Sequence, residues 1–364
     1  MILLGASDTE LRRGAELLKM GKLVAFPTET VYGLGADAFN TRALARVFEA
    51  KGRPRFDPLI IHIARFDALD RIVLFEALDG RRRTLLDKIA ASFWPGPLTL
   101  VLPKRKEVPD LATAGLATAA LRFPSHPAAQ ALITLSTGAV AAPSANPFGR
   151  LSPTRAEHVI EGLGDKIDCV IDGGPSAVGV ESTVLDLSVS GPPRILRYGG
   201  IGREALEAAI GPVEAPAAAA GEDAAGAYPQ GGRSSPGTED RARSAPGNLR
   251  GHYAPGTPLI LHGSDALAYS VYRGGEGYLF FSGKNRDAFV GRNPGASALF
   301  VLSEAGSVLE AAANLFELLH RLDRLGLDRI HAEMLPQEGL GAALNDRLSR
   351  ASAGSLLPPP GKYT

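Results

Sequence analysis

Two short segments carry the side chains best suited to chemistry. The first, Lys51-Gly-Arg-Pro-Arg-Phe-Asp-Pro-Leu59, has Lys and Arg one residue apart, followed by Pro54 and Pro58. Proline is excluded from helix interiors, so the apolar run Thr41–Ala50 must end near Lys51 and place both cations on a stiff loop. Arginine offers a planar fork and lysine a point charge, which suits a polyphosphate or a pair of carboxylates. We expect these cations to be exposed in the free protein.

The second segment is Ser144-Ala-Asn146, which follows the apolar run Gly138–Ala142. That run is typical of a buried strand. The segment therefore supplies a hydroxyl and an amide at a strand end, where open α/β sheets bind ligands. Taken alone, each segment is weak evidence, because a Lys-Gly-Arg loop and a Ser-Ala-Asn turn are most often plain surface turns.

Further motifs occur in one order along the chain and resemble a known family. In the N-terminal half they are Pro27-Thr-Glu-Thr-Val-Tyr-Gly-Leu-Gly35, Trp94-Pro-Gly-Pro-Leu-Thr99, Arg122-Phe-Pro-Ser-His-Pro127, Ser152-Pro-Thr154 and Gly179-Val-Glu-Ser-Thr183. Together with the Lys-x-Arg and Ser-x-Asn pairs they resemble the YrdC-like domain of threonylcarbamoyl-AMP synthases, over roughly Asp8 to Arg203. The downstream motifs resemble the C-terminal domain of the two-domain members; they are His252-Tyr-Ala-Pro255, Gly339-Leu-Gly341 and Asn345-Asp-Arg-Leu348.

The resemblance implies a nucleotidyltransferase that condenses L-threonine, bicarbonate or carbon dioxide, and ATP into threonylcarbamoyl-AMP and pyrophosphate. The product would pass to a separate tRNA threonylcarbamoyltransferase complex that makes N6-threonylcarbamoyladenosine (t6A) in tRNA. Mg²⁺ would bind mainly through the ATP phosphates, with no metal site of the protein's own. No enzyme nucleophile is evident in the sequence, and the reaction needs chiefly positioning and charge neutralisation.

The resemblance also assigns residues to two ligands. Lys51 and Arg53 would form the catalytic clamp. The ATP site would comprise Lys51, Arg53, Asp57, Ala142, Ser144, Asn146, Arg197, His252 and Tyr253. The threonine site would comprise Thr30, His62, Arg122 and Ser182, with Arg122 suited to the carboxylate.

Two departures from the family pattern affect the nucleotide site. Asp57 stands where many members carry Asn, and an anion beside phosphates is repulsive unless a metal or Arg55 neutralises it. The segment Pro246-Gly-Asn-Leu-Arg-Gly-His252 differs from the residues usual in relatives, so Arg250, His252 and Tyr253 all remain candidates for the nucleotide contact.

Structural interpretations of the same residues stay open. A lone histidine in an apolar run, such as His62, is often a satisfied half-buried residue. Ser182 precedes β-branched residues and is compatible with an ordinary strand position. Arg197 is also suited to a surface ion pair with Asp186 or Glu181, which would contribute little to stability.

Composition restricts the class of protein. The 364 residues suffice for two domains, and 39 basic residues balance 39 acidic ones. Nucleic-acid-binding proteins usually carry a basic excess, so tRNA binding should be weak, and an RNA-binding or regulatory role, the alternative for this family, is disfavoured. The single cysteine, Cys169, excludes an internal disulfide and a multi-cysteine zinc site. It also argues against the carbamoyl transferases of hydrogenase maturation, in which related domains accompany zinc-finger cysteines.

Cysteine usage and hydropathy also bear on location. One cysteine fits a reducing compartment. No run approaches the ~20 apolar residues of a membrane span, and Met1–Gly5 is too short for a signal sequence. We therefore expect a cytoplasmic protein without a membrane partner.

Periodicity predicts a mixed α/β architecture. Runs that read as strands are Val24–Phe26, Leu59–Ile63, Leu98–Leu102, Ala119–Phe123, Ala139–Ala142, Cys169–Asp172, Thr183–Leu187 and Pro193–Leu196. Predicted helices run from the capping box Ser7–Glu10 to Gly21 and over Thr41–Ala50, Thr84–Phe93, His126–Leu135 and Thr154–Glu161, the last with a capping box at Thr154–Glu157. Because strands and helices do not alternate regularly, we expect a mixed, twisted open sheet of the YrdC-like type.

The chain is predicted to divide into three parts. Residues 1–211 would form the catalytic domain, 212–256 a flexible linker and lid, and 257–364 a smaller α/β, Rossmann-like domain. In the last part, strands are predicted at Pro258–Leu261, Gly277–Phe281, Ala298–Leu302 and Arg329–Ala332, with helices from Asp265 and over Ser307–Leu325. The Pro27–Gly35 segment is predicted to be a loop.

Overall fold

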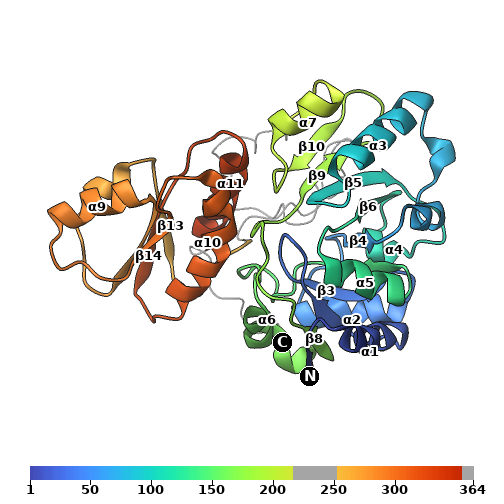
Figure 1. The fold of residues 1–364 in the computed structure, drawn as a ribbon, viewed down its shortest axis with the longest axis horizontal. Coiled ribbons are helices and arrows are strands. Elements are labelled where there is room, and N and C mark those ends of the chain that lie inside the picture. The colour runs from blue at the N-terminus through green and yellow to red at the C-terminus, as the bar shows by residue number, and fades with distance from the viewer. Residues whose placement is uncertain (216–251, 355–364) are drawn as a thin grey trace, which may run out of the picture.

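The computed structural model describes residues 1–215 and 252–354, which form a larger and a smaller α/β unit side by side (Figure 1). Most of the predicted flexible linker, together with Arg250, lies outside the described residues. The predicted combination of a large mixed sheet with a second, smaller α/β domain is confirmed.

The larger unit is built on ten strands in the order β1-β8-β2-β3-β7-β4-β6-β5-β9-β10. They are β1 (Ile2–Leu4), β2 (Val24–Phe26), β3 (Gly33–Asp37), β4 (Ile60–Ile63), β5 (Leu98–Pro103), β6 (Thr118–Arg122), β7 (Ala139–Ala141), β8 (Cys169–Ile171), β9 (Thr183–Asp186) and β10 (Arg194–Arg197). The pairs β1–β8, β8–β2, β4–β6 and β5–β9 are parallel and the others antiparallel, so the sheet is mixed.

Helices cover both faces of this sheet (Figure 1). They are α1 (Asp8–Lys19), α2 (Thr41–Lys51), α3 (Gly80–Phe93), α4 (Asp110–Thr113), α5 (Pro127–Leu135), α6 (Ala156–Leu163) and α7 (Arg203–Ile210), with 3₁₀ turns η1 (Phe66–Arg71), η2 (Phe75–Ala77) and η3 (Gly164–Lys166). The predicted capping box at Ser7–Glu10 opens α1. The one predicted at Thr154–Glu157 is wrong, because α6 starts at Ala156 and the Thr154 backbone N–H donates to the ring of His158.

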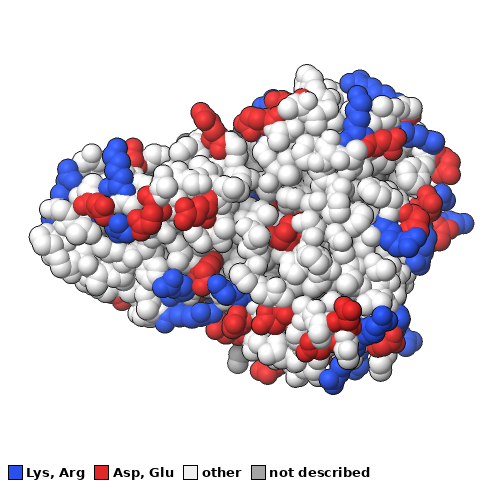
Figure 2. Space-filling model, in the orientation of Figure 1, with Lys and Arg blue, Asp and Glu red and all other residues white. Residues whose placement is uncertain are grey.

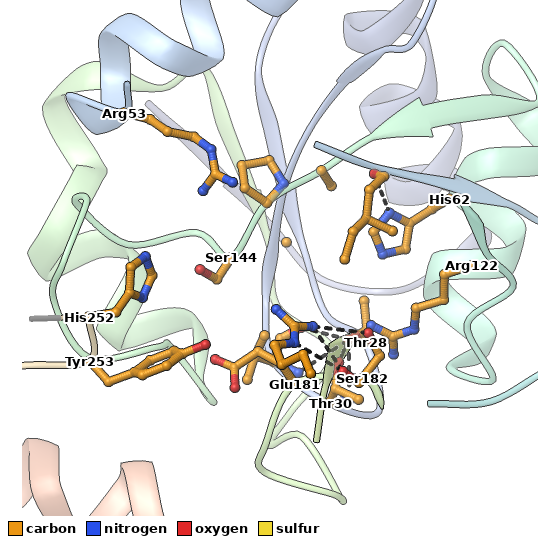
Figure 3. A pocket seen from close by; sticks show the side chains of 16 residues that line it. Thr28, Thr30, Arg53, His62, Arg122, Ser144, Glu181, Ser182, His252 and Tyr253 are labelled. Atoms are coloured by element: carbon orange, nitrogen blue, oxygen red, sulfur yellow. Dashed lines mark hydrogen bonds between the residues drawn. The ribbon is translucent and has the colours of Figure 1, made fainter. Parts of the chain in front are cut away.

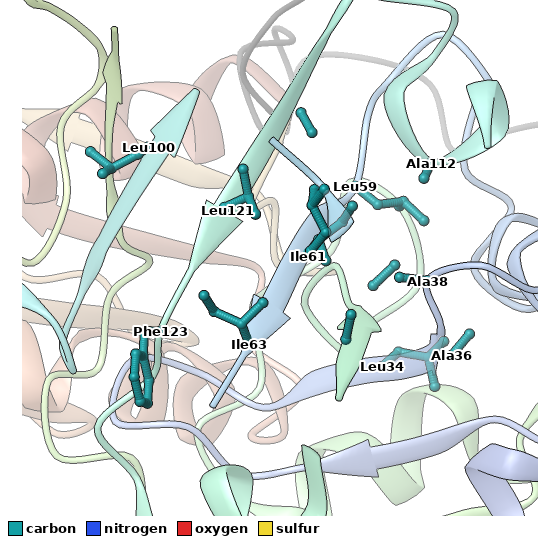
Figure 4. Packing of buried hydrophobic residues seen from close by; sticks show 14 of the residues in the cluster. Leu34, Ala36, Ala38, Leu59, Ile61, Ile63, Leu100, Ala112, Leu121 and Phe123 are labelled. Atoms are coloured by element: carbon teal, nitrogen blue, oxygen red, sulfur yellow. The ribbon is translucent and has the colours of Figure 1, made fainter. Parts of the chain in front are cut away.

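Successive side chains of the strands point to opposite faces of the sheet and form two hydrophobic layers. Ala25 and Leu34 point into the main core beneath α2, whereas Val24 and Phe26 pack on the opposite face with residues of α1 and α5. Figure 4 shows the main core, with residues of β4 and β6 meeting those of β3. The polar segments that follow these strands are therefore fixed by a sheet buried on both faces.

One predicted loop is partly a strand. The last three residues of the Pro27–Gly35 segment begin β3, which pairs antiparallel with β2. Gly35 permits this pairing because a Cβ there would lie 2.8 Å from Phe26 and 2.9 Å from Val140. Glycine weakens the sequence signal of a strand, so the run was predicted as loop.

The smaller unit contains a four-stranded parallel sheet in the order β11-β14-β12-β13. Its elements are β11 (Leu259–His262), η4 (Ala266–Tyr269), β12 (Glu276–Ser282), α9 (Gly283–Arg292), β13 (Leu299–Ser303), α10 (Val308–Asp323), β14 (Arg329–Glu333) and α11 (Leu340–Gly354). The predicted strands and α10 are present. The helix predicted from Asp265 is only the 3₁₀ turn η4, because Asp265 has a φ of 61°. Helices α9 and α11 were not predicted.

Helices α10 and α11 face the larger unit (Figure 1). One hydrophobic cluster spans both units, since Val31 and Val180 belong to it together with Leu315 and Phe316 of α10. Gly179 allows this approach: its φ is 76°, and a Cβ there would overlap the α10 backbone. The two units thus share buried surface beside the segments that follow β2 and precede β9.

Candidate active site

Segments distant in sequence converge on one cavity of ≈ 50 Å³ in the larger unit (Figure 3). It is lined by Thr28, Thr30, Val31, Gly33, Arg53, Ile60, His62, Arg122, Ala142, Pro143, Ser144, Glu181, Ser182, Arg197, His252 and Tyr253. Ten of these were predicted as site residues from the sequence: Thr30, Arg53, His62, Arg122, Ala142, Ser144, Ser182, Arg197, His252 and Tyr253. Lys51, Asp57 and Asn146 do not line it.

Lys51 is the last residue of α2 and points inward. Its ammonium donates to the backbone carbonyls of Ser144, at 2.6 Å, and of Asn146. Burial, reinforced by the charge of Arg53, lowers the pKa of Lys51 well below its ordinary value. The expectation of an exposed loop clamp is wrong for both cations, since Lys51 is 3% and Arg53 7% exposed. Lys51 instead holds the segment that presents Ser144.

Arg53 and Asp57 form a buried ion pair at 2.8 Å. The guanidinium also donates to the backbone carbonyls of Asp57 and Pro58, at 3.1 and 2.8 Å. The sequence suggested Arg55 as the neutralising group, but Arg53 takes this part. Burial raises the pKa of Asp57, against the charges of Arg53 and Lys51. The anion is therefore compensated within the loop that follows α2.

The side chains of Ser144 and Asn146 lie in different places although the two residues are close in sequence. Ser144 lines the cavity, while the Asn146 amide nitrogen donates to the backbone carbonyls of Pro147 and Arg150, at 2.9 and 2.8 Å. The carbonyl oxygen of the Asn146 side chain is buried and has no partner among the described residues. Asn146 therefore shapes the loop behind the cavity.

Arg122 comes from the end of β6 and meets Glu29 in a second buried ion pair, at 2.8 Å. Arg122 Nη2 and both carboxylate oxygens of Glu29 are buried and have no aligned hydrogen bond within the described residues. Burying such groups is costly unless they are paired. Arg122 lines the cavity and Glu29 lies directly behind it, so the pair is suited to a ligand whose anionic group meets the guanidinium.

Hydroxyl-bearing side chains form two hydrogen-bonded pairs, of which Thr28, Thr30 and Ser182 line the cavity. Thr30 Oγ1 lies 2.9 Å from Thr28 Oγ1, which donates to the Val31 carbonyl at 2.6 Å. Ser182 Oγ lies 2.7 Å from the hydroxyl of Thr99. A network of this kind fixes hydroxyl positions and can distinguish ligands by their own hydroxyl groups.

Arg197 and His62 border this network. Arg197 Nη2 donates to the Ser182 carbonyl at 2.9 Å and to its hydroxyl at 3.3 Å. The surface ion pair that the sequence allowed for Arg197 is not what the structure shows, since the side chain is buried. His62 Nδ1 donates to the Ile60 carbonyl at 3.1 Å, and burial lowers the His62 pKa to about 3. His62 is therefore neutral at physiological pH.

His252 and Tyr253 close the cavity from the start of the segment leading into the smaller unit (Figure 3). Both ring nitrogens of His252 are buried without a partner among the described residues, and burial lowers its pKa well below the ordinary value. Tyr253 packs against Phe316 of α10, with ring centroids 5.7 Å apart. The backbone N–H of Ala254 donates to the Gly149 carbonyl at 2.8 Å, which fixes this segment on the larger unit.

Sequence reasoning missed Glu181 as a site residue. It lines the cavity beside Ser182 and binds Ser152 and Arg347. The motif Gly179–Thr183 contains it, but nothing local in the sequence indicates a partner 166 residues away.

Cations and carboxylates are buried at the ends of strands. No activated nucleophile lies beside them in the described residues. This arrangement is typical of an enzyme that binds and orients anionic small molecules. A family model described as "Telomere recombination" matches residues 16–199, and the model of the threonylcarbamoyl-AMP synthase C-terminal domain matches residues 201–353. The chain belongs to the threonylcarbamoyl-AMP synthase family, as the sequence motifs indicated.

Relatives match the chain over almost its full length. The threonylcarbamoyl-AMP synthase of Pyrococcus abyssi is 43% identical over 353 residues, 96% of each chain. That of Bacillus subtilis is 38% identical over 364 residues, which is 97% of this chain and 96% of the relative. Among solved structures, Pyrococcus abyssi Sua5 complexed with L-threonine superposes with a TM-score of 0.79 at 39% identity, covering 98% of both chains.

Proposed function

We propose that this protein is an L-threonylcarbamoyladenylate synthase serving t6A modification of tRNA. The threonine amine is carboxylated by bicarbonate or carbon dioxide, and the carbamate oxygen then attacks the α-phosphorus of ATP. Pyrophosphate leaves and threonylcarbamoyl-AMP forms. The observation that carries the proposal is the two-domain match to synthases over the whole chain, combined with an arginine-lined cavity where the family motifs converge.

Threonine would bind at the floor of the cavity. Arg122 is suited to its carboxylate, and Glu29, which is ion-paired with Arg122 behind the cavity wall, is the carboxylate proposed to attract its amine before carboxylation. Thr30, Ser182 and neutral His62 offer hydroxyl and ring groups to the side-chain hydroxyl. The support for this placement is the density of buried polar groups there, together with the threonine complex of the Pyrococcus abyssi relative.

ATP would occupy the side of the cavity bounded by Arg53, Ser144 and Arg197. Arg53 is already paired with Asp57, so it would share its charge between that carboxylate and the phosphates. Lys51 would act behind this wall by holding the Ser144 carbonyl. Charge neutralisation of the triphosphate and of the carbamate is the main catalytic requirement.

Mg²⁺ would enter with ATP, held mainly by the phosphates. No group of three metal-ligating side chains occurs in residues 1–215 and 252–354. The metal would add charge neutralisation at the phosphates, while Asp57 is already compensated by Arg53.

The segment His252–Pro255 is proposed as a lid. His252 and Tyr253 line the cavity and leave little free space in it, ≈ 50 Å³, so we expect both side chains to shift when a nucleotide enters. Tyr253 has a φ of 66°, a conformation that costs a non-glycine residue about 1–2 kcal/mol. Strain of this kind at a site edge suits a segment with two positions. Closure would keep water from the carbamate.

The RNA-binding alternative receives no support. On the face shown in Figure 2, basic and acidic side chains are interspersed along the edges. The formal net charge is zero.

No helix among the described residues is long and apolar enough to cross a membrane. The transferase that accepts the product, and a cytoplasmic location, remain parts of the proposal.

The proposal is tested by incubating the protein with labelled bicarbonate, L-threonine, ATP and Mg²⁺. Threonylcarbamoyl-AMP and pyrophosphate should form in equal amounts, and omission of any one substrate should abolish both. Release of pyrophosphate without threonine, or incorporation of label without ATP, would refute the assigned reaction.

A further inference from the structure

Buried arginine–carboxylate pairs surround the cavity. In the described parts of the chain, only three ion pairs have both side chains less than one-tenth exposed: Arg53–Asp57, Arg122–Glu29 and Arg347–Glu181. The first two lie wholly within the larger unit. The third joins Glu181 of the cavity wall to Arg347 of α11 in the smaller unit.

The geometry of Arg347 leaves it little freedom. The side chain is 1% exposed, and its Nε donates to Glu181 Oε2 at 3.1 Å. Asp346 lies 3.1 Å from Nη1 and keeps the guanidinium compensated from the other side. The charged end also lies 5.4 Å from the ring centroid of Tyr253, within the range of a cation–π contact.

Glu181 in turn touches several cavity groups. Its other carboxylate oxygen accepts from Ser152. In Figure 3 the Tyr253 hydroxyl points toward the Glu181 carboxylate. The Glu181 charge also acts on Arg197, the cation at the end of β10. A carboxylate at this place would attract Arg197 away from Ser182 if no other cation balanced it.

We propose that Arg347 is a positioning residue of the active site, supplied by the second domain: it holds Glu181 in place, so that Arg197 stays directed at the ligand and Tyr253 stays on the cavity. The inference rests on the proposed function and extends it, because it gives the second domain a defined part in the reaction. Arg347 does not line the cavity, so it acts through Glu181 and Tyr253.

The test is a double-mutant cycle on the full-length protein, using Arg347→Met, Glu181→Gln and the double variant. Arg347→Met leaves a buried carboxylate with one donor lost, and kcat/KM should fall about tenfold or more. The double variant should be no worse than Glu181→Gln alone, because the group through which Arg347 acts is then uncharged. Arg347→Lys, which keeps the charge but not the fork, should restore activity in part.

A matched control comes from the same interface. Arg324 pairs with Glu161 across the two units at 2.8 Å, but both side chains are about half exposed. Arg324→Ala should therefore leave kcat/KM within about twofold of the wild type, since exposed pairs contribute little. Thermal unfolding of each variant shows whether it is folded at the assay temperature.

The outcomes separate the two proposals. A wild-type protein that makes no threonylcarbamoyl-AMP refutes the proposed function, whereas an active wild type with additive losses in the cycle refutes only the role of Arg347. Equal losses in Arg347→Met and Arg324→Ala would likewise show a general interface effect. If Arg347→Met does not fold, Arg347→Lys and the charge-free double variant decide the question, because removing both members of a buried pair is often tolerated.

Discussion

Replacing Lys51 by alanine should lower both the stability of the protein and its kcat/KM. The ammonium donates to two buried carbonyls, those of Ser144 and Asn146. Hydrogen bonds from a charged group contribute about 1.5–3 kcal/mol each, and part of this offsets the cost of burying the charge. A net loss of about 3 kcal/mol is expected, because Lys51→Ala leaves both carbonyls without this donor. For a domain of this size the melting temperature should fall by about 6–12 °C.

The assay compares urea and thermal unfolding of Lys51→Ala with those of Lys88→Ala. Lys88 is an exposed lysine of α3 and serves as a matched control, for which less than about 0.5 kcal/mol is expected. kcat/KM should fall together with stability, since the segment presenting Ser144 is released. An unfolding free energy of Lys51→Ala within about 0.5 kcal/mol of the wild type would refute the reasoning.

Three further outcomes follow from the site. The rate should fall in the order threonine, serine, valine: serine loses a methyl contact of roughly 1 kcal/mol, whereas valine leaves hydroxyl-binding groups unpaired. Steady-state kinetics check this, and equal rates with valine would exclude a hydroxyl-reading pocket. Arg53→Met should lower the unfolding free energy by about 3 kcal/mol, and adding Asp57→Asn should restore most of it in urea titrations, because the uncompensated anion is removed. Burial lowers the His158 pKa from 6.5 to about 3. The unfolded state alone then binds this proton, so stability is full above pH 6.5 and declines as pH falls toward 3. In His158→Gln, the melting temperature should depend less on pH across that range than it does in the wild type.

The sequence predicted most strands of the larger unit because their apolar runs are short and sharply bounded. It also placed the end of α2 near Lys51, one residue short of the observed end, because the prolines of the next segment exclude further helix. What it misjudged was the direction of the Lys51 side chain. The buried residues of α2 include Leu44, Val47 and Phe48, and Lys51 continues that stripe at a spacing of three and four residues. The spacing of Lys51 therefore indicated a buried position, but the charge of its side chain favoured the prediction of an exposed one.

Other features have no local signal. Which cation neutralises Asp57 depends on the path of the loop: the sequence suggested Arg55 or a metal, whereas the structure pairs Asp57 with Arg53. The partners of Glu181 come from Ser152 and from Arg347, far along the chain. Helix α11 follows Pro336 and Gly339, which are typical of a turn, and the helix was not predicted. Side-chain pairs made by tertiary packing are therefore the part of the site that the sequence could not supply.

If His252–Pro255 acts as the proposed lid, we expect contacts with the second unit to contribute to the energy of opening the site. In the closed conformation Tyr253 keeps an unfavourable φ while it packs between Phe316 of α10 and Arg347 of α11. The proposed opening would relieve the backbone strain but would remove these contacts and the hydrogen bond from Ala254 to Gly149. If only a fraction of molecules is open, the apparent affinity for ATP falls by that fraction. In this proposal, the contacts of α10 and α11 with Tyr253 tune nucleotide access, although no side chain of these two helices lines the cavity.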